Sequence, residues 1–295
     1  MPSSWLFIQG LGLGVLAGGV YALLASGLTL SFGIMRVVQL SHAAFLVLAA
    51  YLSYLLFATV GMNPLLAAVL IAPLFYVVGN LLYRGLLTRA GTGNPVMSVL
   101  VTFGLALFIE GLIGVTAGGI YRTVDLPWAY ESIGVFGARL PVGRIVAFGA
   151  ACVTLGMLFA LLRWTRFGRA VRATMQDRDA ARLVGIDVER VSAAAFGVAL
   201  ATTAAGGACL TLITTFHPAM HWEWLARLLA IVVIGGLGSL VGAGLAAFAM
   251  GIVEAMLAVT VDPTWAAMAF YLALFLVLVL RPHGLLGDPI SVRRA

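Results

Sequence analysis

The sequence predicts an all-α fold, a polytopic bundle of membrane-spanning helices in a single domain over residues 1–295. Two observations support this prediction. The chain is 62% hydrophobic and only 9% charged, with a mean hydropathy of +1.10, whereas soluble domains are about half apolar and a quarter charged. Apolar runs near the length of ~20 residues that crosses the hydrocarbon core also recur along the chain.

Interruptions by Gly, Pro and Arg divide the chain into apolar segments. The segment 225–236 is too short to span alone, so we expect about eight transmembrane helices, some of them discontinuous. No basic region precedes the first apolar run, so we expect this run to remain as a helix rather than to be removed as a signal peptide. The segments lie near residues 5–33, 37–58, 63–83, 94–117, 141–162, 191–215, 225–236, 241–261 and 264–281.

Arginine clusters predict the orientation, because positively charged residues favour the cytoplasmic side of a membrane. We assign three clusters to the cytoplasm: Arg84 with Arg89, the seven arginines of residues 163–190, and Arg281 with Arg293 and Arg294. The longest loop on the opposite side is 118–140. Counting crossings then places Arg36 near the cytoplasm and the N-terminus outside.

Two stretches interrupt the continuous spans. Polar and glycine residues break the hydrophobicity of residues 28–45, and five glycines break that of 235–244. Discontinuous membrane helices occur where they line a cavity or pack inside protein, so both breaks are candidates for a transport path. Close helix packing around small residues is the alternative. The candidate path residues in these breaks are Arg36, Gln39, His42, Gly235, Gly236, Gly238 and Ser239.

Two carboxylates, Glu110 and Glu254, lie inside apolar segments and complete the candidate path set. A charge at the bilayer centre costs about 2.5–3.5 kcal/mol on insertion scales, so such residues face water or the protein interior. They line the path or, alternatively, form hydrogen bonds to neighbouring helices. Arg36 and His42 also have two interpretations each. Either they contact a substrate or a partner, or Arg36 extends its charged group to the membrane interface and His42 forms an interhelical hydrogen bond.

Two histidines, His217 and His221, lie four residues apart in a short segment that we expect to be an exterior loop. Pro218 intervenes and no third ligand is near, so no metal site is expected. The loop is interpreted as ordinary, or as a surface for a binding protein.

Residues 163–190 form the single charged segment of the chain, with 11 of its 28 Arg, Asp and Glu residues. Phe167, Ala170, Val171 and Thr174 have amphipathic helical spacing. Asp177 as N-cap and Gly185 as C′ glycine then predict a second helix, Arg178 to Val184. A helix of two turns is marginal alone in water, which favours docking on a partner. A solvated loop that only sets the topology is the alternative.

The chain contains no lysine. A phosphate-binding loop of the G-x-x-x-x-G-K-[ST] type requires a lysine on the β- and γ-phosphates of the nucleotide. The chain therefore has no such loop, and any ATP on which it depends is hydrolysed by a partner. No Ser-His-Asp order, H-E-x-x-H motif or carboxylate cluster at a membrane face indicates an enzyme.

Within the charged segment, Asp179-Ala180-Ala181-Arg182-Leu183-Val184-Gly185 is similar to the E-A-A-x-x-x-G loop of ABC importer permeases, with Asp in place of the usual Glu. The wider run TRFGRAVRATMQDRDAARLVGIDVERV resembles that loop in the branched-chain amino-acid permeases. Three further blocks resemble the same family in the right order: YALLASGLTLSFGIMRVVQLSHAAF, GGLGSLVGAGLAAFAMGIVEAML and LVLRPHGLLG. Length and layout look like the shorter of the two permeases in that system.

The resemblance implies a non-catalytic permease subunit in the bacterial inner membrane that forms half of a pore for branched-chain or other apolar amino acids. It also implies the partners: a homologous second permease, two ABC ATPase subunits that bind ATP and Mg²⁺, and a periplasmic solute-binding protein. The chain itself is expected to contact lipid. It is expected to bind neither a cofactor nor a nucleic acid. The residues expected to couple to the ATPase are Asp177, Asp179, Ala180, Ala181, Leu183, Val184, Gly185 and Ile186.

One block departs from the family pattern. The run after Met-Arg is usually close to V-V-N-F-A-H-G, whereas here Gln39 and Ala43 replace Asn and Gly. These changes keep polarity but alter size, which bears on any substrate assignment at this break. A self-sufficient secondary transporter, with Glu110 or Glu254 as the site of a coupling proton, is the competing function.

Overall fold

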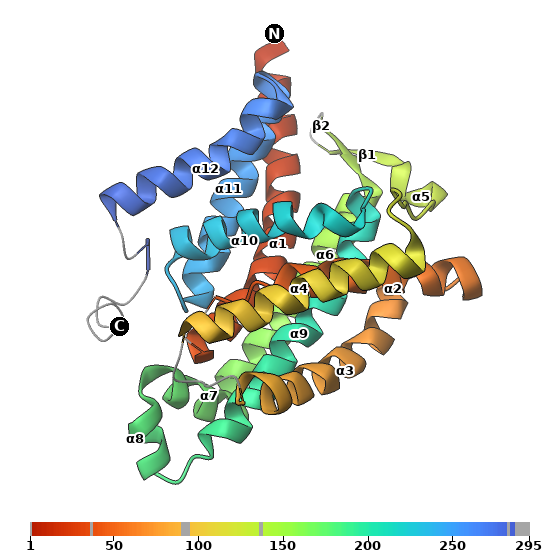
Figure 1. Ribbon diagram of the computed structural model, residues 1–295. Helices are drawn as coiled ribbons and strands as arrows, with labels where there is room; N and C mark the ends of the chain where they lie inside the picture. Colours follow the sequence, from red (N-terminus) through yellow and green to blue (C-terminus); the bar gives the residue numbers. More distant parts are fainter. Residues whose placement is uncertain (1, 36–37, 90–94, 136–137, 282–283, 287–295) are drawn as a thin grey trace.

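The computed structural model describes residues 2–35, 38–89, 95–135, 138–281 and 284–286. Within these ranges, seven helices are long and apolar enough to cross a membrane, and α1 runs through the middle of the assembly (Figure 1). The predicted multi-pass helical bundle is therefore confirmed. The seven spans are α1 (Pro2–Met35), α2 (His42–Val60), α3 (Pro64–Leu82) with the π-helix η1 (Tyr83–Leu87), α4 (Pro95–Ala117), α6 (Val142–Trp164), α9 (Val188–Ile213) and α11 (Leu240–Thr260).

Two further apolar helices are α10 (His221–Gly235) and α12 (Pro263–Leu280), so each predicted apolar segment contains a helix. The N-cap of α12 is Asp262, whose carboxylate accepts a hydrogen bond from the Thr264 N–H at 2.8 Å. Hydrogen bonding to Thr264 lowers the pKa of Asp262. The short elements are α5 (Pro127–Tyr130), β1 (Ser132–Val135), β2 (Ala138–Pro141), α7 (Arg166–Gln176), α8 (Arg178–Leu183) and η2 (Pro218–Met220).

Helices α1 and α11 pack closely along a seam of glycines. An ideal Cβ on Gly14 would lie 2.5 Å from Ile252 Cα, and one on Gly18 would lie 2.7 Å from Phe248 Cα. The pairing order shows that the two helices run antiparallel. Small residues allow the backbones of membrane helices to approach closely and to gain van der Waals contact. The high glycine content of the chain is thus explained in part by this seam.

Helix α9 joins two halves of the buried core. Its C-terminal part, including Cys209 and Leu210, packs with α1, α10 and α11. Phe196 and Leu200, nearer its start, pack with α2, α3 and α4. Gly197 permits contact with α3, because a Cβ there would lie 2.7 Å from the Tyr76 carbonyl oxygen. The result is a helix that is buried along most of its length and holds the two groups together.

Residues 118–135 and 138–141 contain the short helix α5 and the strands β1 and β2 at one end of the molecule. Strands β1 and β2 form an antiparallel hairpin with Ser132 opposite Pro141. Gln9 near the start of α1 bonds this hairpin twice: its side chain donates to the Arg139 carbonyl and accepts from the Arg139 N–H, both at 2.7 Å. The loop and the start of α1 therefore share one end, opposite α7 and α8 (Figure 1). This relative placement agrees with the predicted topology.

Candidate functional site

The charged segment folds as two short helices joined at Asp177. The carboxylate of Asp177 caps α8 by accepting hydrogen bonds from the N–H groups of Asp179 at 2.9 Å and Ala180 at 3.1 Å. Gly185 follows the helix with a φ of +83°, a left-handed conformation that favours glycine. Both predicted caps are therefore confirmed, because cap chemistry depends on residues close in sequence.

The amphipathic helix predicted before α8 is also confirmed. Helix α7 buries Val171 and Thr174 and exposes Arg169 and Arg172. Thr165 accepts a hydrogen bond from the Gly168 N–H at 3.0 Å and caps the start of α7. The buried face of α7 packs with Leu30 and Ile34 near the end of α1. Because α8 follows α7 directly, this packing positions α8 next to the bundle.

The two faces of α8 have different neighbours. Ala181 is 3% exposed, whereas Leu183 and Val184 are 89% and 76% exposed. Ala181 therefore faces the chain itself. The large apolar side chains left for a partner are Leu183 and, directly after the helix, Val184, with the exposed Ala180 beside them. On the inward side, Arg178 donates a hydrogen bond to the hydroxyl of buried Tyr83 at 3.3 Å, which ties α8 to η1.

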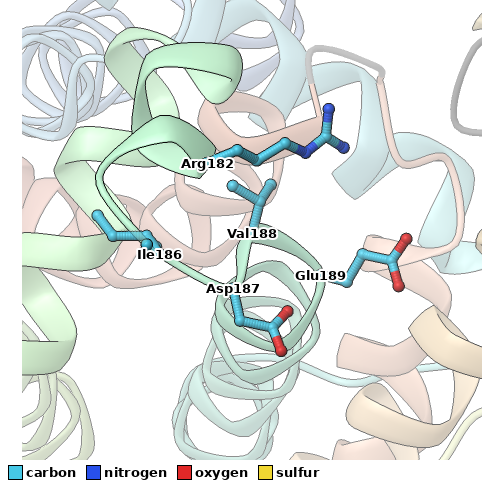
Figure 2. A pocket seen from close by; sticks show the side chains of 6 residues that line it. Arg182, Ile186, Asp187, Val188 and Glu189 are labelled. Atoms are coloured by element: carbon cyan, nitrogen blue, oxygen red, sulfur yellow. The ribbon is translucent and has the colours of Figure 1, made fainter.

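Beside α8, an open groove of about 390 Å³ lies between the end of this helix and the start of α9. Arg182, Ile186 and Glu189 lie along it with the exposed Asp187 (Figure 2). Asp179 forms an exposed ion pair with Arg182 at 3.1 Å. The groove thus offers charges of both signs next to the exposed apolar pair, a composition suited to a protein partner.

The first predicted break is shorter than the sequence indicated. Helix α1 continues through Ser31 and Gly33 to Met35, and α2 begins at His42. Gln39 is fully buried, and its side-chain oxygen accepts a hydrogen bond from the Ser31 hydroxyl at 2.8 Å. This hydrogen bond satisfies the polar side chain of Ser31 inside the protein, so α1 can continue as a buried helix through this residue. Arg36 lies outside the described residues.

His42 opens α2 and is buried against α1. Its Nε2 atom lies 3.2 Å from the Leu24 carbonyl oxygen. This contact matches the interhelical hydrogen bond that was the alternative to a substrate contact. The structure thus gives Gln39 and His42 a packing role, and their contribution to a path stays a prediction.

The second break lies between α10 and α11. Gly236 and Gly238 have φ values of +104° and +84°, and the Ser239 hydroxyl caps α11 by accepting from the Gly242 N–H at 3.1 Å. The N–H groups of Leu285 and Leu286 donate to the Ile234 and Gly235 carbonyls at 2.8 and 3.1 Å. Residues 284–286 therefore cover the end of α10, where Gly235 and Gly236 are buried, and the contribution of these glycines to a path stays a prediction.

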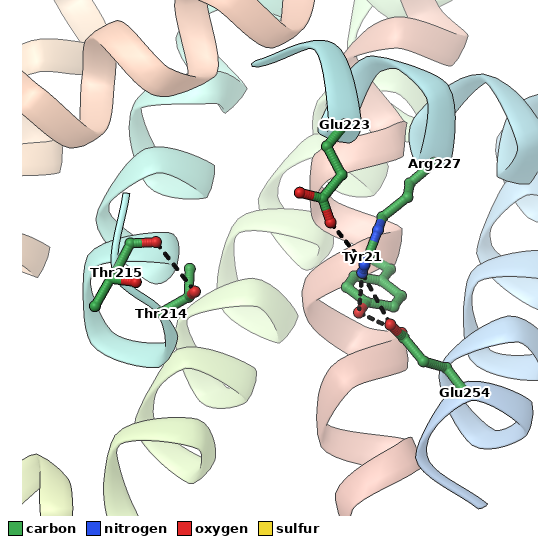
Figure 3. A network of polar contacts seen from close by, with 6 residues as sticks. All are labelled: Tyr21, Thr214, Thr215, Glu223, Arg227 and Glu254. Carbon is green, nitrogen blue, oxygen red and sulfur yellow. Dashed lines mark hydrogen bonds and ion pairs between the residues drawn. The ribbon is translucent and has the colours of Figure 1, made fainter. Parts of the chain in front are cut away.

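Glu254 on α11 belongs to a polar network that joins three helices (Figure 3). Its carboxylate accepts hydrogen bonds from Arg227 of α10 at 2.8 Å and from the Tyr21 hydroxyl of α1 at 2.5 Å. Arg227 also pairs with Glu223 at 2.8 Å. Aromatic rings enclose the guanidinium, with the Trp224 and Phe270 centroids 5.7 and 5.6 Å from its central carbon. Glu254 is therefore paired with residues of two other helices inside the bundle.

Glu110 on α4 lies near His221, the first residue of α10. Its carboxylate is 3.8 Å from His221 Nε2, and the other ring nitrogen lies 3.0 Å from the Pro218 carbonyl. The expectation that His221 lies in an exterior loop is wrong: it is the first residue of α10 and is fully buried. Among the described residues, no three His, Cys, Asp or Glu side chains gather where a metal ion could be held.

Helix α10 thus links both predicted carboxylates, through His221 to Glu110 and through Arg227 to Glu254. Sequence reasoning missed Arg227 and Tyr21. Arg227 is a charge at the start of the apolar segment 225–236. Because a membrane-embedded arginine requires a counter-charge, this position was the available signal for a partner of Glu254. Nothing in the sequence indicated Tyr21, whose role depends on how the helices pack.

Comparisons with known proteins agree with the fold. Residues 11–279 match the family described as "Branched-chain amino acid transport system / permease component". The high-affinity branched-chain amino acid transport system permease protein LivH of Salmonella typhimurium is 26% identical, with 96% of each chain covered. Its counterpart BraD of Pseudomonas aeruginosa is 25% identical, with 98% of each covered.

One solved structure is similar in fold. A chain of PsaBC from Streptococcus pneumoniae in complex with Fab superposes with a TM-score of 0.50 over 96% of this chain and 97% of that one. The sequences are 12% identical. This similarity supports the helical architecture alone.

Proposed function

We infer the function from one premise: the chain belongs to the family of permease components of branched-chain amino acid transport systems. It is a multi-pass membrane permease subunit of an ATP-binding-cassette importer. We propose that its cargo is branched-chain or other apolar amino acids, as the names of its relatives say of them. We further propose that a homologous second permease completes the pore, and that the membrane is the bacterial inner membrane.

The exposed helix α8 is the observation that supports the coupling mechanism. We propose that two ATPase subunits, which bind the ATP and Mg²⁺, each receive such a helix and move it when they close on ATP. The receiving cleft would bury Leu183 and Val184, which are the exposed apolar residues of α8. Asp177 and Gly185 keep the helix formed, and Ile186 borders the groove. Asp179 is exposed and pairs with Arg182, and Ala181 supports the helix from within. A solute-binding protein would deliver the amino acid at the opposite end.

Leu183→Arg is expected to abolish co-purification with the ATPase subunits while insertion into the membrane stays normal. The change places a charge on the apolar tip of α8, where burial of an unpaired charge opposes docking. Affinity purification of the tagged permease, followed by quantification of the ATPase, measures the effect. Ile133→Arg is the matched control, because Ile133 is an exposed apolar residue on the hairpin at the other end. Equal ATPase recovery with both variants contradicts the coupling role of α8.

An ion-coupled secondary transporter gains no support from these observations. Glu254, one of two candidates for a coupling proton, already accepts hydrogen bonds from Arg227 and Tyr21. Dependence of uptake on the ATPase subunits in proteoliposomes distinguishes the two functions. Uptake by the permease alone, driven by a proton gradient, would contradict the importer assignment.

A further inference from the structure

A cavity of about 180 Å³ lies beside the Arg227 network, between α1, α6, α10 and the end of α9. Its apolar lining residues include Leu16, Val20 and Ile213. Its polar lining residues are Tyr21, Arg144, Thr214, Trp224 and Arg227. A liquid water molecule occupies about 30 Å³, so the cavity exceeds the size of a single bridging water. A lining that combines apolar and polar side chains is typical of a site for a small amphipathic molecule.

Two of the polar lining residues, Trp224 and Arg144, carry groups that only donate hydrogen bonds. Trp224 is 5% exposed, and its Nε1–H group has no acceptor among the described residues. A buried donor without an acceptor is unfavourable, which makes it an exception that requires an explanation. Arg144 forms no ion pair with any residue that the structure describes. Both groups call for an acceptor, and an anionic one suits the guanidinium.

Neither carboxylate of the Glu254 network pairs with Arg144. The carboxylate of Glu254 accepts hydrogen bonds from Arg227 at 2.8 Å and from the Tyr21 hydroxyl at 2.5 Å. The carboxylate of Glu223 accepts one from Arg227 at 2.8 Å. With one arginine and two carboxylates the network has a formal charge of −1, but both carboxylates are oriented toward Arg227. The donors of Arg144 on α6 therefore form no ion pair with the network and remain available to a ligand in the cavity.

We propose that this cavity binds the carboxylate of a small aliphatic amino acid on its way through the pore. Arg144 and the Trp224 Nε1–H donate hydrogen bonds to the carboxylate, and the aliphatic side chain lies against Leu16, Val20 and Ile213. A planar guanidinium matches a carboxylate through two parallel hydrogen bonds, and burial of the aliphatic group is favourable by the hydrophobic effect. This inference rests on the proposed function and adds a binding site to it.

The first test uses the full transporter in proteoliposomes, with its solute-binding protein loaded with L-leucine. Arg144→Gln is expected to lower the leucine transported per ATP hydrolysed about tenfold, the usual effect of losing a charge-assisted hydrogen bond. ATP hydrolysis stimulated by the loaded binding protein is expected to remain. Arg144→Lys should recover part of the ratio. Arg139→Gln is the matched control, since Arg139 is an exposed arginine on the hairpin outside the cavity.

The outcomes separate this inference from the proposed function. If the wild-type transporter moves no leucine with ATP, the proposed function fails. If the wild type moves leucine and Arg144→Gln moves as much per ATP, the cavity is not a binding site for the carboxylate. A fall of the same size with Arg139→Gln would also overturn the inference, because it would show a general effect of arginine loss.

A second measurement does not depend on a variant that folds. Thermal unfolding of the detergent-solubilised wild-type transporter is compared with L-leucine, with 4-methyl-2-oxopentanoate and with L-leucinamide. We expect the two carboxylates to raise the Tm and the amide to leave it unchanged. Trp224→Phe keeps a ring of similar shape but removes the Nε1–H, so it should reduce the shift. Stabilisation by leucinamide equal to that by leucine, or no shift with leucine, overturns the proposal.

Discussion

Replacing Arg227 with methionine is expected to lower the free energy of unfolding by about 3–5 kcal/mol, the usual cost of removing one partner from a buried ion pair. The change leaves the carboxylate of Glu254 in the bundle with the Tyr21 hydroxyl as its remaining donor. Arg227 and Glu254 are each 17% exposed in their side chains, so water cannot replace the lost contact fully. Thermal unfolding in detergent, followed by the loss of the monodisperse species, measures the change.

A double variant separates the loss of the pair from the loss of packing. Arg227→Met with Glu254→Gln removes both charges and is expected to recover most of the stability, because a neutral pair needs no compensation. The exposed pair of Arg190 with Asp187 has the same separation of 2.8 Å, so Arg190→Met serves as the control, with an expected cost below about 1 kcal/mol. Equal effects of Arg227→Met and Arg190→Met would show that the Glu254 network is not stabilising.

The features that the sequence predicted best depend on nearby residues. Asp177 and Gly185 delimit α8 because both caps are determined within one helical turn. The spans could be predicted from their hydropathy alone, because a membrane helix forms the hydrogen bonds of its backbone within itself. The end of α1 was predicted less well, because the bond from Ser31 to Gln39 makes polar residues compatible with a buried helix.

The features that were not predicted depend on contacts between helices. Ala181 was grouped with Leu183 and Val184, but the direction in which a short helix faces is set by what it packs against, here η1 and α9. Tyr21 and Glu254 are 233 positions apart, and no local pattern connects them. The hairpin of residues 132–141 was absent from an all-α prediction, because strands of four residues are too short to produce a clear alternation.

Gly251→Leu is expected to prevent stable packing of α1 on α11, with a loss of more than about 3 kcal/mol, because the overpacking cost of 1–3 kcal/mol for a few methylenes is exceeded here. An ideal Cβ on Gly251 would lie 2.5 Å from the Gly18 nitrogen and 2.8 Å from the Gly14 carbonyl oxygen. Both are backbone atoms, so no side chain can move aside to make room. The two helices would have to separate along the whole seam.

Gly244→Leu is the matched control, since a Cβ on this glycine of the same helix meets no atom within 4 Å. Its side chain would enter open space at the surface of α11, where replacing glycine favours the helix by about 1 kcal/mol. We therefore expect membrane yield and thermal stability near wild type for Gly244→Leu and a loss of folded protein for Gly251→Leu, with Gly251→Ala between them. Since α1 carries Tyr21 and α11 carries Glu254, separation of the seam would also pull the Arg227 network apart. Wild-type stability of Gly251→Leu would therefore contradict both the seam and the network that depends on it.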